Sequence, residues 1–189
     1  MPSSTLDQQR LIRYGPETSD YSVAVITDED QATQVHLEDG QVAWRSMLRY
    51  DRLHRREDPV TGNVRYSFEE IPPTQGGRQQ LISLIAEGGR GAELSEQVQF
   101  GDKLLAFDDR TGLVCEIRAG HELIPRQILI AGSGDEAFKG FKAEWATLQG
   151  DQLVVGSHGK VGIDDGGVVT GPEEWIKVID RDYRIRSIN

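Results

Sequence analysis

Ser95 and Glu144, two residues with oxygen ligands, occupy equivalent places in an internal repeat. The segment G-D-K-L-L at 101–105 matches G-D-Q-L-V at 150–154, and the T-G turn at 61–62 matches the one at 111–112. The offset of the first match carries Ser95 onto Glu144. Hydroxyl and carboxylate oxygens are hard ligands that suit Ca²⁺, which tolerates irregular geometry. The pair predicts a calcium site if the repeats converge; otherwise Ser95 is a turn hydroxyl and Glu144 a surface carboxylate.

A second set of residues could handle phosphate. Arg90 lies in the glycine-rich segment 88–91, where its guanidinium group could bind a phosphate through two hydrogen bonds. The segment lacks the Gly-Lys-Ser/Thr ending of a P-loop, so an ordinary loop is the alternative. Asp28 and Asp30 follow an apolar run and could orient a water molecule or cap a loop. Trp145 could stack on a base or belong to the core.

Other chemistries are not indicated by the composition. The four histidines show no paired spacing, and Cys115 is the only cysteine, so no zinc site is predicted. Cys115 lies in an apolar run and is expected to be buried. The net charge of −10 argues against non-specific binding to nucleic acid. No apolar run reaches the ~18 residues of a membrane span.

Short strands joined by turns must position these residues. Glycines and acidic turns separate short apolar runs, and no segment has a helical period, so an all-β fold is predicted. A repeat of about 50 residues built from short strands is typical of β-propeller blades with roughly four strands each. The predicted strands are 21–26, 41–51, 63–69, 81–85, 97–100, 103–108, 113–118, 143–148, 152–156, 175–180 and 184–188.

The chain also resembles a known family through five segments in order. They are A-V-I-T-D-E-D at 24–30, G-R-G-A-E-L-S-E at 89–96, F-D-D-R-T-G-L-V at 107–114, K-G-F-K-A-E-W at 139–145 and E-W-I-K-V at 174–178. These segments are similar to motifs of the soluble calcium-activated nucleotidase (apyrase) family. The resemblance extends from about residue 21 to the C-terminus.

This resemblance implies a five-bladed β-propeller that hydrolyses nucleoside di- and triphosphates such as UDP and GDP and releases inorganic phosphate. It implies Ca²⁺ as cofactor and leaves a homodimer open. Ser95, the backbone at Glu96, and Glu144 fall on calcium-ligand positions, and the repeat points independently to Ser95 and Glu144. The implied catalytic residues are Asp28, Arg90 and Asp109, and the implied substrate-binding residues are Asp30, Arg90, Asp108, Arg110, Lys142 and Trp145.

The expected organisation is a flexible arm, 1–20, followed by a partial β-propeller nucleotidase domain, 21–189. Five blades of about 49 residues exceed this chain, so roughly three blades are expected. The family's G-K-E-W segment is altered here to G-K-V-G at 159–162. The alternative is a truncated, non-catalytic propeller fragment that serves as an interaction or ligand-binding module. The family points to the secretory pathway, although residues 1–10 lack the apolar stretch of a signal peptide.

Overall fold

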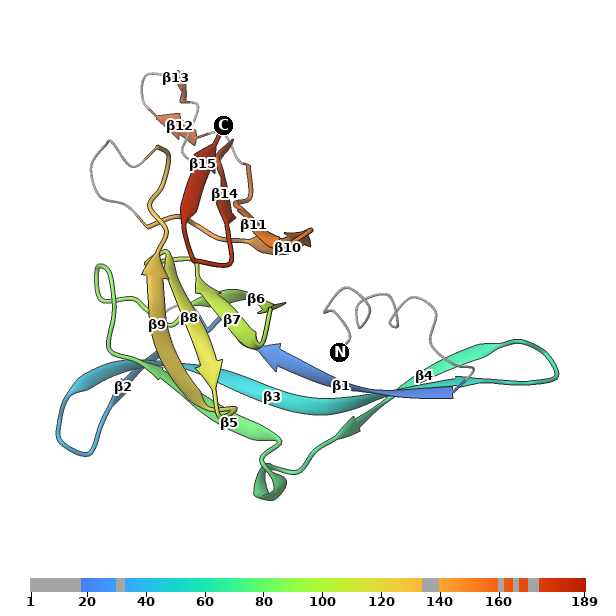
Figure 1. Cartoon of the computed structure of the whole chain (residues 1–189). Coiled ribbons are helices and arrows are strands. Elements are labelled where there is room, and N and C mark those ends of the chain that lie inside the picture. Colours follow the sequence, from blue (N-terminus) through green and yellow to red (C-terminus); the bar gives the residue numbers. More distant parts are fainter. Residues whose placement is uncertain (1–17, 30–32, 134–139, 160–161, 165–166, 170–173) are drawn as a thin grey trace. The chain divides into compact units, whose positions relative to one another are not determined.

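The computed structural model describes residues 18–29, 33–133, 140–159, 162–164, 167–169 and 174–189 (Figure 1). The chain divides into two compact units, the first formed by residues 1–25 and 48–79 and the second by residues 26–47 and 80–189. The one helix whose residues are all described is a single 3₁₀ turn, η2 (Pro73–Gln75), and the other elements described are strands. The prediction of an all-β fold is therefore confirmed. No described helix has the length and hydrophobicity of a membrane span.

The first sheet is organised around one long strand, β3 (Val42–Glu57). β3 pairs with all four other strands of this sheet: β1 (Thr18–Ile26), β2 (Gln34–His36), β4 (Val64–Glu70) and β5 (Arg78–Ser83). Sequence reasoning ended this strand at residue 51, because residues 52–57 carry mostly charged side chains. The strand continues because residues 51–57 pair with β4 in an antiparallel hairpin.

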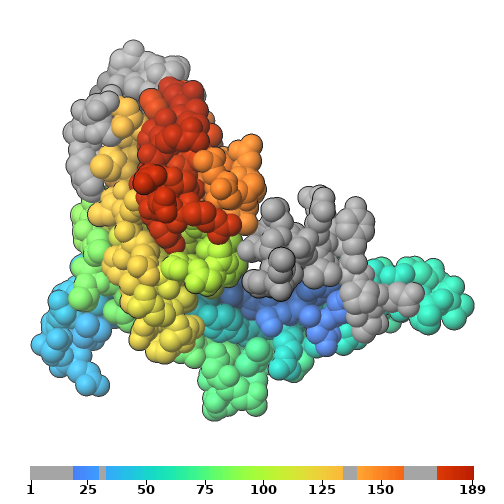
Figure 2. All heavy atoms as spheres, in the orientation of Figure 1, coloured from blue at the N-terminus to red at the C-terminus, as the bar shows by residue number. Residues whose placement is uncertain are grey.

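From residue 48 onward, β3 belongs to the first unit, so the hairpin that it forms with β4 lies entirely in that unit. Its turn is fixed by Asp58, whose Oδ1 accepts hydrogen bonds from the backbone N–H groups of Val60 at 2.8 Å and Thr61 at 3.0 Å. The N–H of Gly62 donates to the Asp58 carbonyl at 2.8 Å, and Gly62 takes the left-handed φ of +70° that glycine favours. The hairpin is the turquoise segment of Figure 2.

The second unit contains two four-stranded antiparallel sheets with the same simple order. One consists of β6 (Leu94–Phe100), β7 (Lys103–Asp108), β8 (Leu113–Arg118) and β9 (Glu122–Ile128). The other consists of β10 (Trp145–Gln149), β11 (Gln152–Gly156), β14 (Ile176–Ile179) and β15 (Ile185–Ile188). A short hairpin, β12 (Gly162–Asp164) and β13 (Gly167–Val169), is inserted between β11 and β14. Four strands per sheet agree with the four strands per repeat inferred from the sequence.

One hydrophobic core joins these two sheets, and β6 contacts β10. Lys177 of β14 is also buried, with 2% of its surface exposed, and its Nζ donates to the carbonyl of Gly132 at 2.5 Å and to Ser187 Oγ at 2.8 Å. Burial lowers the pKa of Lys177. Cys115 is fully buried, as predicted, and burial raises its pKa to about 12. The core residues are Phe100, Leu105, Phe107, Val114, Leu129, Phe141, Ala143, Leu153, Val155 and Ile179.

Candidate functional site

The end of β7 is held by a buried carboxylate, Asp108, which has only 1% of its surface exposed. Its Oδ1 accepts from the backbone N–H groups of Arg110 at 2.9 Å and Thr111 at 3.2 Å, and its Oδ2 accepts from the N–H of Ala92 at 2.9 Å. Asp108 therefore connects the turn after β7 to the loop before β6. Burial raises its pKa, although the three hydrogen bonds act in the opposite direction. The resemblance implied a substrate contact here, and the structure places both carboxylate oxygens on backbone groups.

The start of β6 contains a β-bulge at Ser95. Leu94 pairs with Asp108 and Glu96 pairs with Phe107, so Ser95 is the extra residue. A bulge of this kind redirects side chains and is common beside functional sites. The Ser95 hydroxyl donates to the carbonyl of Ala143, the residue before Glu144. The two positions matched by the sequence repeat therefore lie beside each other in the folded unit.

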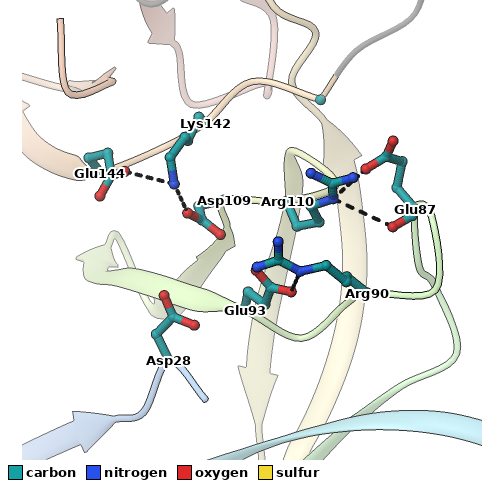
Figure 3. Close-up of a pocket in the computed structure, with 9 residues that line it drawn as sticks. Asp28, Glu87, Arg90, Glu93, Asp109, Arg110, Lys142 and Glu144 are labelled. Carbon is teal, nitrogen blue, oxygen red and sulfur yellow. Dashed lines mark hydrogen bonds and ion pairs between the residues drawn. The ribbon is translucent and has the colours of Figure 1, made fainter. Parts of the chain in front are cut away.

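An open pocket of about 510 Å³ forms next to this turn and bulge, entirely within the second unit. Figure 3 shows charged side chains of both signs facing it, and they come from four separate segments of the chain. The pocket is lined by Asp28, Glu87, Arg90, Glu93, Asp109, Arg110, Gly140, Lys142 and Glu144. Six of these were candidate residues from the sequence: Asp28, Arg90, Asp109, Arg110, Lys142 and Glu144.

Arg90 is oriented by a carboxylate that sequence analysis did not assign. Its Nε and Nη2 donate to Glu93 Oε1 and Oε2 at 2.7 and 2.6 Å, which is a two-bond guanidinium–carboxylate pair. The Glu93 side chain is 2% exposed and the Arg90 side chain 32%. Burial raises the pKa of Glu93, and the contact with Arg90 partly offsets this effect. The buried glutamate thus holds the arginine toward the pocket.

Lys142 lies between two carboxylates on the opposite side of the pocket (Figure 3). Its Nζ contacts Asp109 Oδ2 and lies 3.0 Å from Glu144 Oε1. Burial lowers the pKa of Lys142, but its hydrogen bonds to Asp109 and Glu144 outweigh burial, and the net shift is upward. Burial raises the pKa of Asp109, and Lys142 counteracts it. Asp109 Oδ1 is buried and has no hydrogen-bond partner among the described residues, so it is an acceptor available to a ligand.

A third cation, Arg110, is paired with the loop before β6. Its Nε lies 2.5 Å from Glu87 Oε2 and 3.5 Å from the Glu87 carbonyl. Trp44 also fixes this loop, because its Nε1 donates to the carbonyl of Gly89 at 3.0 Å. Gly140 closes the pocket floor, where a Cβ would lie 2.3 Å from the carbonyl carbon of Thr111. Only glycine allows this close approach of two backbone segments.

The three predicted calcium ligands provide oxygen donors only, which fits a hard cation. Glu96 Oε1 accepts from the N–H of Gln97 at 2.7 Å, and Glu96 Oε2 accepts from the N–H of Ala146 on β10 at 3.4 Å. The segments that carry Ser95, Glu96 and Glu144 therefore lie side by side where β6 meets the start of β10. Across the described ranges, no group of three or more His, Cys, Asp or Glu side chains is arranged to hold a metal ion.

Two predicted substrate-binding residues remain, Asp30 and Trp145. Asp30 falls outside the described residues. Trp145 does not line the pocket; its ring covers Gly156, and its Nε1 donates to the carbonyl of Ser157 at 3.0 Å. Sequence reasoning missed Glu87, Glu93 and Gly140. For Glu93 a signal existed, because it follows Arg90 by three residues in the G-R-G-A-E-L-S-E segment.

Comparison with known proteins identifies the family. The sequence model of the Apyrase family matches residues 29–189. The chain is 33% identical over 169 residues to an apyrase of Phlebotomus duboscqi, covering 89% of this chain and 46% of that protein. It is 36% identical over 160 residues to soluble calcium-activated nucleotidase 1 of Rattus norvegicus, covering 84% and 36%. It is 40% identical over 116 residues to an apyrase of Cimex lectularius, covering 61% and 31%. The chain thus spans less than half the length of these relatives, and it belongs to the apyrase family.

Proposed function

We propose that this chain provides the phosphate-binding part of a calcium-dependent nucleotidase that hydrolyses nucleoside di- and triphosphates and releases inorganic phosphate. The proposal extends to the fold: the two four-stranded sheets would be blades of a five-bladed β-propeller, of which this chain covers roughly three. The arm expected over residues 1–20 would end before β1, because residues 18–20 already belong to that strand. Membership in the apyrase family and the printed names of the relatives support this proposal.

The observation that carries the proposal is the grouping of Arg90, Arg110 and Lys142 around one pocket. Two guanidinium groups and an ammonium group match the negative charge of a di- or triphosphate chain. Each of these cations contacts a carboxylate of the same pocket, which orients it before a ligand arrives. Preoriented charges of this kind are the main source of catalysis in phosphoryl transfer.

In the proposed reaction a water oxygen bonds to the terminal phosphorus, and the bond from phosphorus to the bridging oxygen breaks. Arg90, held by Glu93, would stabilise charge on the transferring group. Asp28 would orient the water, and the buried Oδ1 of Asp109 would accept a hydrogen bond from water or substrate. Arg110 and Lys142 would contact the remaining phosphates.

The residues proposed to hold Ca²⁺ are Ser95, Glu96 and Glu144. When bound, Ca²⁺ would supply positive charge that offsets the phosphate oxygens. Binding there requires Lys142 to share or release Glu144, whose Oε1 now lies 3.0 Å from its ammonium group. The oxygen-only donor set and the position of these residues beside the pocket support this assignment.

A second candidate is a module that binds nucleotide without hydrolysing it. The observation in its favour is that Ser95, Glu96 and Glu144 supply fewer oxygens than the six to eight that Ca²⁺ usually takes. Under this alternative the pocket still recognises phosphate, and the chain lacks turnover.

The test combines phosphate release with calorimetric binding of UDP and GDP, in Ca²⁺ and after chelation. The proposal predicts release that requires Ca²⁺, and binding that weakens in Arg110→Ala and Glu144→Ala. The matched controls are Arg184→Ala, whose side chain is 78% exposed, and Glu122→Ala on the exposed start of β9, and both should be unchanged. Calcium-dependent binding without release would favour the second candidate. If UDP and GDP bind equally well to Arg110→Ala, Glu144→Ala and the wild-type chain, the proposed phosphate site is wrong.

A further inference from the structure

Lys177 of β14 is a buried cation that the proposed reaction does not use. Only 2% of its surface is exposed, and its Nζ donates to the carbonyl of Gly132 at 2.5 Å and to Ser187 Oγ at 2.8 Å. Among the described residues no carboxylate pairs with this ammonium group, and it does not line the pocket. Removing an ammonium group from water without a countercharge costs free energy. An apolar side chain would fill the same space without this cost, so the contacts of the charge itself need an explanation.

Two aromatic rings complete the surroundings of this ammonium group. Nζ lies 5.3 Å from the centroid of the Phe141 ring and 5.9 Å from that of the Trp175 ring. The attraction between a cation and a ring face strengthens where water is excluded, and Phe141 is 1% exposed. Lys177 therefore contacts the segment between β9 and β10 at two points, the carbonyl of Gly132 and the ring of Phe141.

Phe141 connects Lys177 to the pocket, because its two neighbours in the chain, Gly140 and Lys142, both line it. Lys142 contacts Asp109 and Glu144 there (Figure 3). A binding side chain is placed accurately only when the residues that support it are themselves locked by packing. A fixed Phe141 ring thus restricts where the Lys142 ammonium group can lie.

The backbone of the same segment is tied to the turn after β7. The N–H of Phe141 donates to the carbonyl of Leu129 at 2.8 Å, and the N–H of Leu129 donates to the carbonyl of Gly112 at 2.7 Å. The turn after β7, which carries Asp109, closes at Gly112. Displacing Phe141 would therefore also disturb this turn.

We propose that Lys177 is a positioning residue for the phosphate pocket. Its ammonium group holds Gly132 and Phe141 in place, and Phe141 in turn sets the position of Lys142 and of the turn after β7. The inference rests on the proposed phosphate site, because Lys142 is one of the three cations assigned to the phosphates. Lys177 does not line the pocket, so it acts on a ligand only through Phe141.

This role predicts that stability and binding respond differently to Lys177→Met. Replacing a buried charge by an apolar side chain of similar volume is often neutral or stabilising. The two acceptors left behind can bind water, because Ser187 is exposed and Gly132 is half-buried. We therefore expect a free energy of unfolding that equals or exceeds that of the wild-type chain, together with a displaced Lys142. A residue that only supported the core would give the reverse result, with stability lost and binding kept.

The first experiment measures the order of the segment without any ligand. Amide hydrogen exchange of the whole chain should become about tenfold faster at Phe141 and Leu129 in Lys177→Met, because their hydrogen bonds open more often. The amides of β8, which lies in the same unit, should keep their wild-type rates. Unchanged exchange at Phe141 and Leu129 would overturn the proposal.

The second experiment measures calorimetric binding of inorganic pyrophosphate and UDP to the whole chain in the presence of Ca²⁺. Lys177→Met should weaken the binding of both ligands about tenfold, since affinity is lost when a preoriented charge is displaced. The matched control is Val178→Ala, at the next residue of β14, which is buried and points to the opposite face. This control should lower the free energy of unfolding and leave binding unchanged.

The outcomes separate this inference from the proposed function. If the wild-type chain binds neither ligand, the phosphate site is wrong and Lys177 has no pocket to position. If the wild-type chain binds both and Lys177→Met binds them equally well, only the role of Lys177 is wrong.

A double replacement tests whether the effect passes through Phe141. Phe141→Leu keeps an apolar side chain and removes the ring that faces the ammonium group. It should weaken pyrophosphate binding in the wild-type chain and have little further effect in Lys177→Met, because residues that act as one unit are not additive. Losses that add would show that Lys177 does not act through Phe141, and would overturn the proposal.

Discussion

Asp108 and Asp58 begin two turns of the same kind, one buried and one exposed. Comparing them permits a quantitative test. Both begin a D-x-x-T-G segment, and both accept hydrogen bonds from the N–H groups two and three residues later. In each turn the glycine N–H donates to the aspartate carbonyl, at 2.8 Å for Asp58 and 2.9 Å for Asp108. The difference is burial: Asp58 is exposed, whereas Asp108 is 1% exposed and also binds the N–H of Ala92.

Replacing Asp108 by alanine should therefore destabilise the second unit strongly. The change leaves three backbone N–H groups without their acceptor in a buried region, and each such loss costs about 1–3 kcal/mol. Some relaxation and water entry will reduce the sum, so we expect a decrease in unfolding free energy of about 3–5 kcal/mol. Asp58→Ala should have a much smaller effect, because water can replace the exposed carboxylate.

The assay is urea unfolding of both variants, with amide hydrogen exchange at Ala92 and Thr111. Faster exchange at these two amides in Asp108→Ala would show that the turn and the loop have separated. A decrease in the free energy of unfolding of less than about 1 kcal/mol in Asp108→Ala, or one equal to that of Asp58→Ala, would refute the assignment. Asp108 would then not connect the turn after β7 to the loop before β6. A direct substrate contact, by contrast, would reduce nucleotide binding in Asp108→Ala without this loss of stability.

Three further predictions concern other buried or charged groups. His54 donates hydrogen bonds to the carboxylates of Asp20 and Glu69, which raise its pKa above 6.5. Its stabilising effect should therefore be complete below pH 6.5 and lost as pH rises through the raised value. NMR titration should show a lower midpoint in Asp20→Asn, and an unchanged midpoint contradicts this prediction. Burial lowers the pKa of Lys177 below 10.5, so the free energy of unfolding should rise as pH approaches 10.5. This pH dependence should vanish in Lys177→Met. If it persists in that variant, another group causes it. A Cβ at Gly156 would lie 2.0 Å from the Trp145 ring. Gly156→Ala should therefore lower the free energy of unfolding by about 1–3 kcal/mol and alter tryptophan fluorescence. Unchanged urea unfolding would contradict this packing.

The sequence predicted those strands of the second unit well that are short apolar runs bounded by turns. The bounds of β7, β8 and β11 agree with the predicted strands, because each is a short apolar run between glycine or acidic turns. β9 was missed, since Pro125 and its charged residues do not resemble a strand. It forms nevertheless because it is the last strand of its sheet, where a missing N–H donor is tolerated.

The candidate site was predictable for the residues that face the pocket and not for those that hold them. Arg90 stands out beside glycines, and the motif segments include Asp109, Lys142 and Glu144. Glu93 and Glu87 act as partners of arginines, and a partner is defined only after the loops have folded. Asp108 and Asp109 are adjacent and chemically identical in the sequence. The chain turns between them, and one becomes the anchor of a turn while the other lines the pocket.

The bulge at Ser95 has a consequence for how variation in this region is tolerated. Because the strand carries one residue more than its partner, deleting Ser95 would let regular pairing with β7 resume. Leu94 would keep Asp108 as its partner and Glu96 would keep Phe107, whereas the hydrogen bond from the Ser95 hydroxyl to the carbonyl of Ala143 would be lost. The extra residue is therefore dispensable for pairing within the sheet, and what it adds is a hydroxyl group that bridges the start of β6 to the segment before β10.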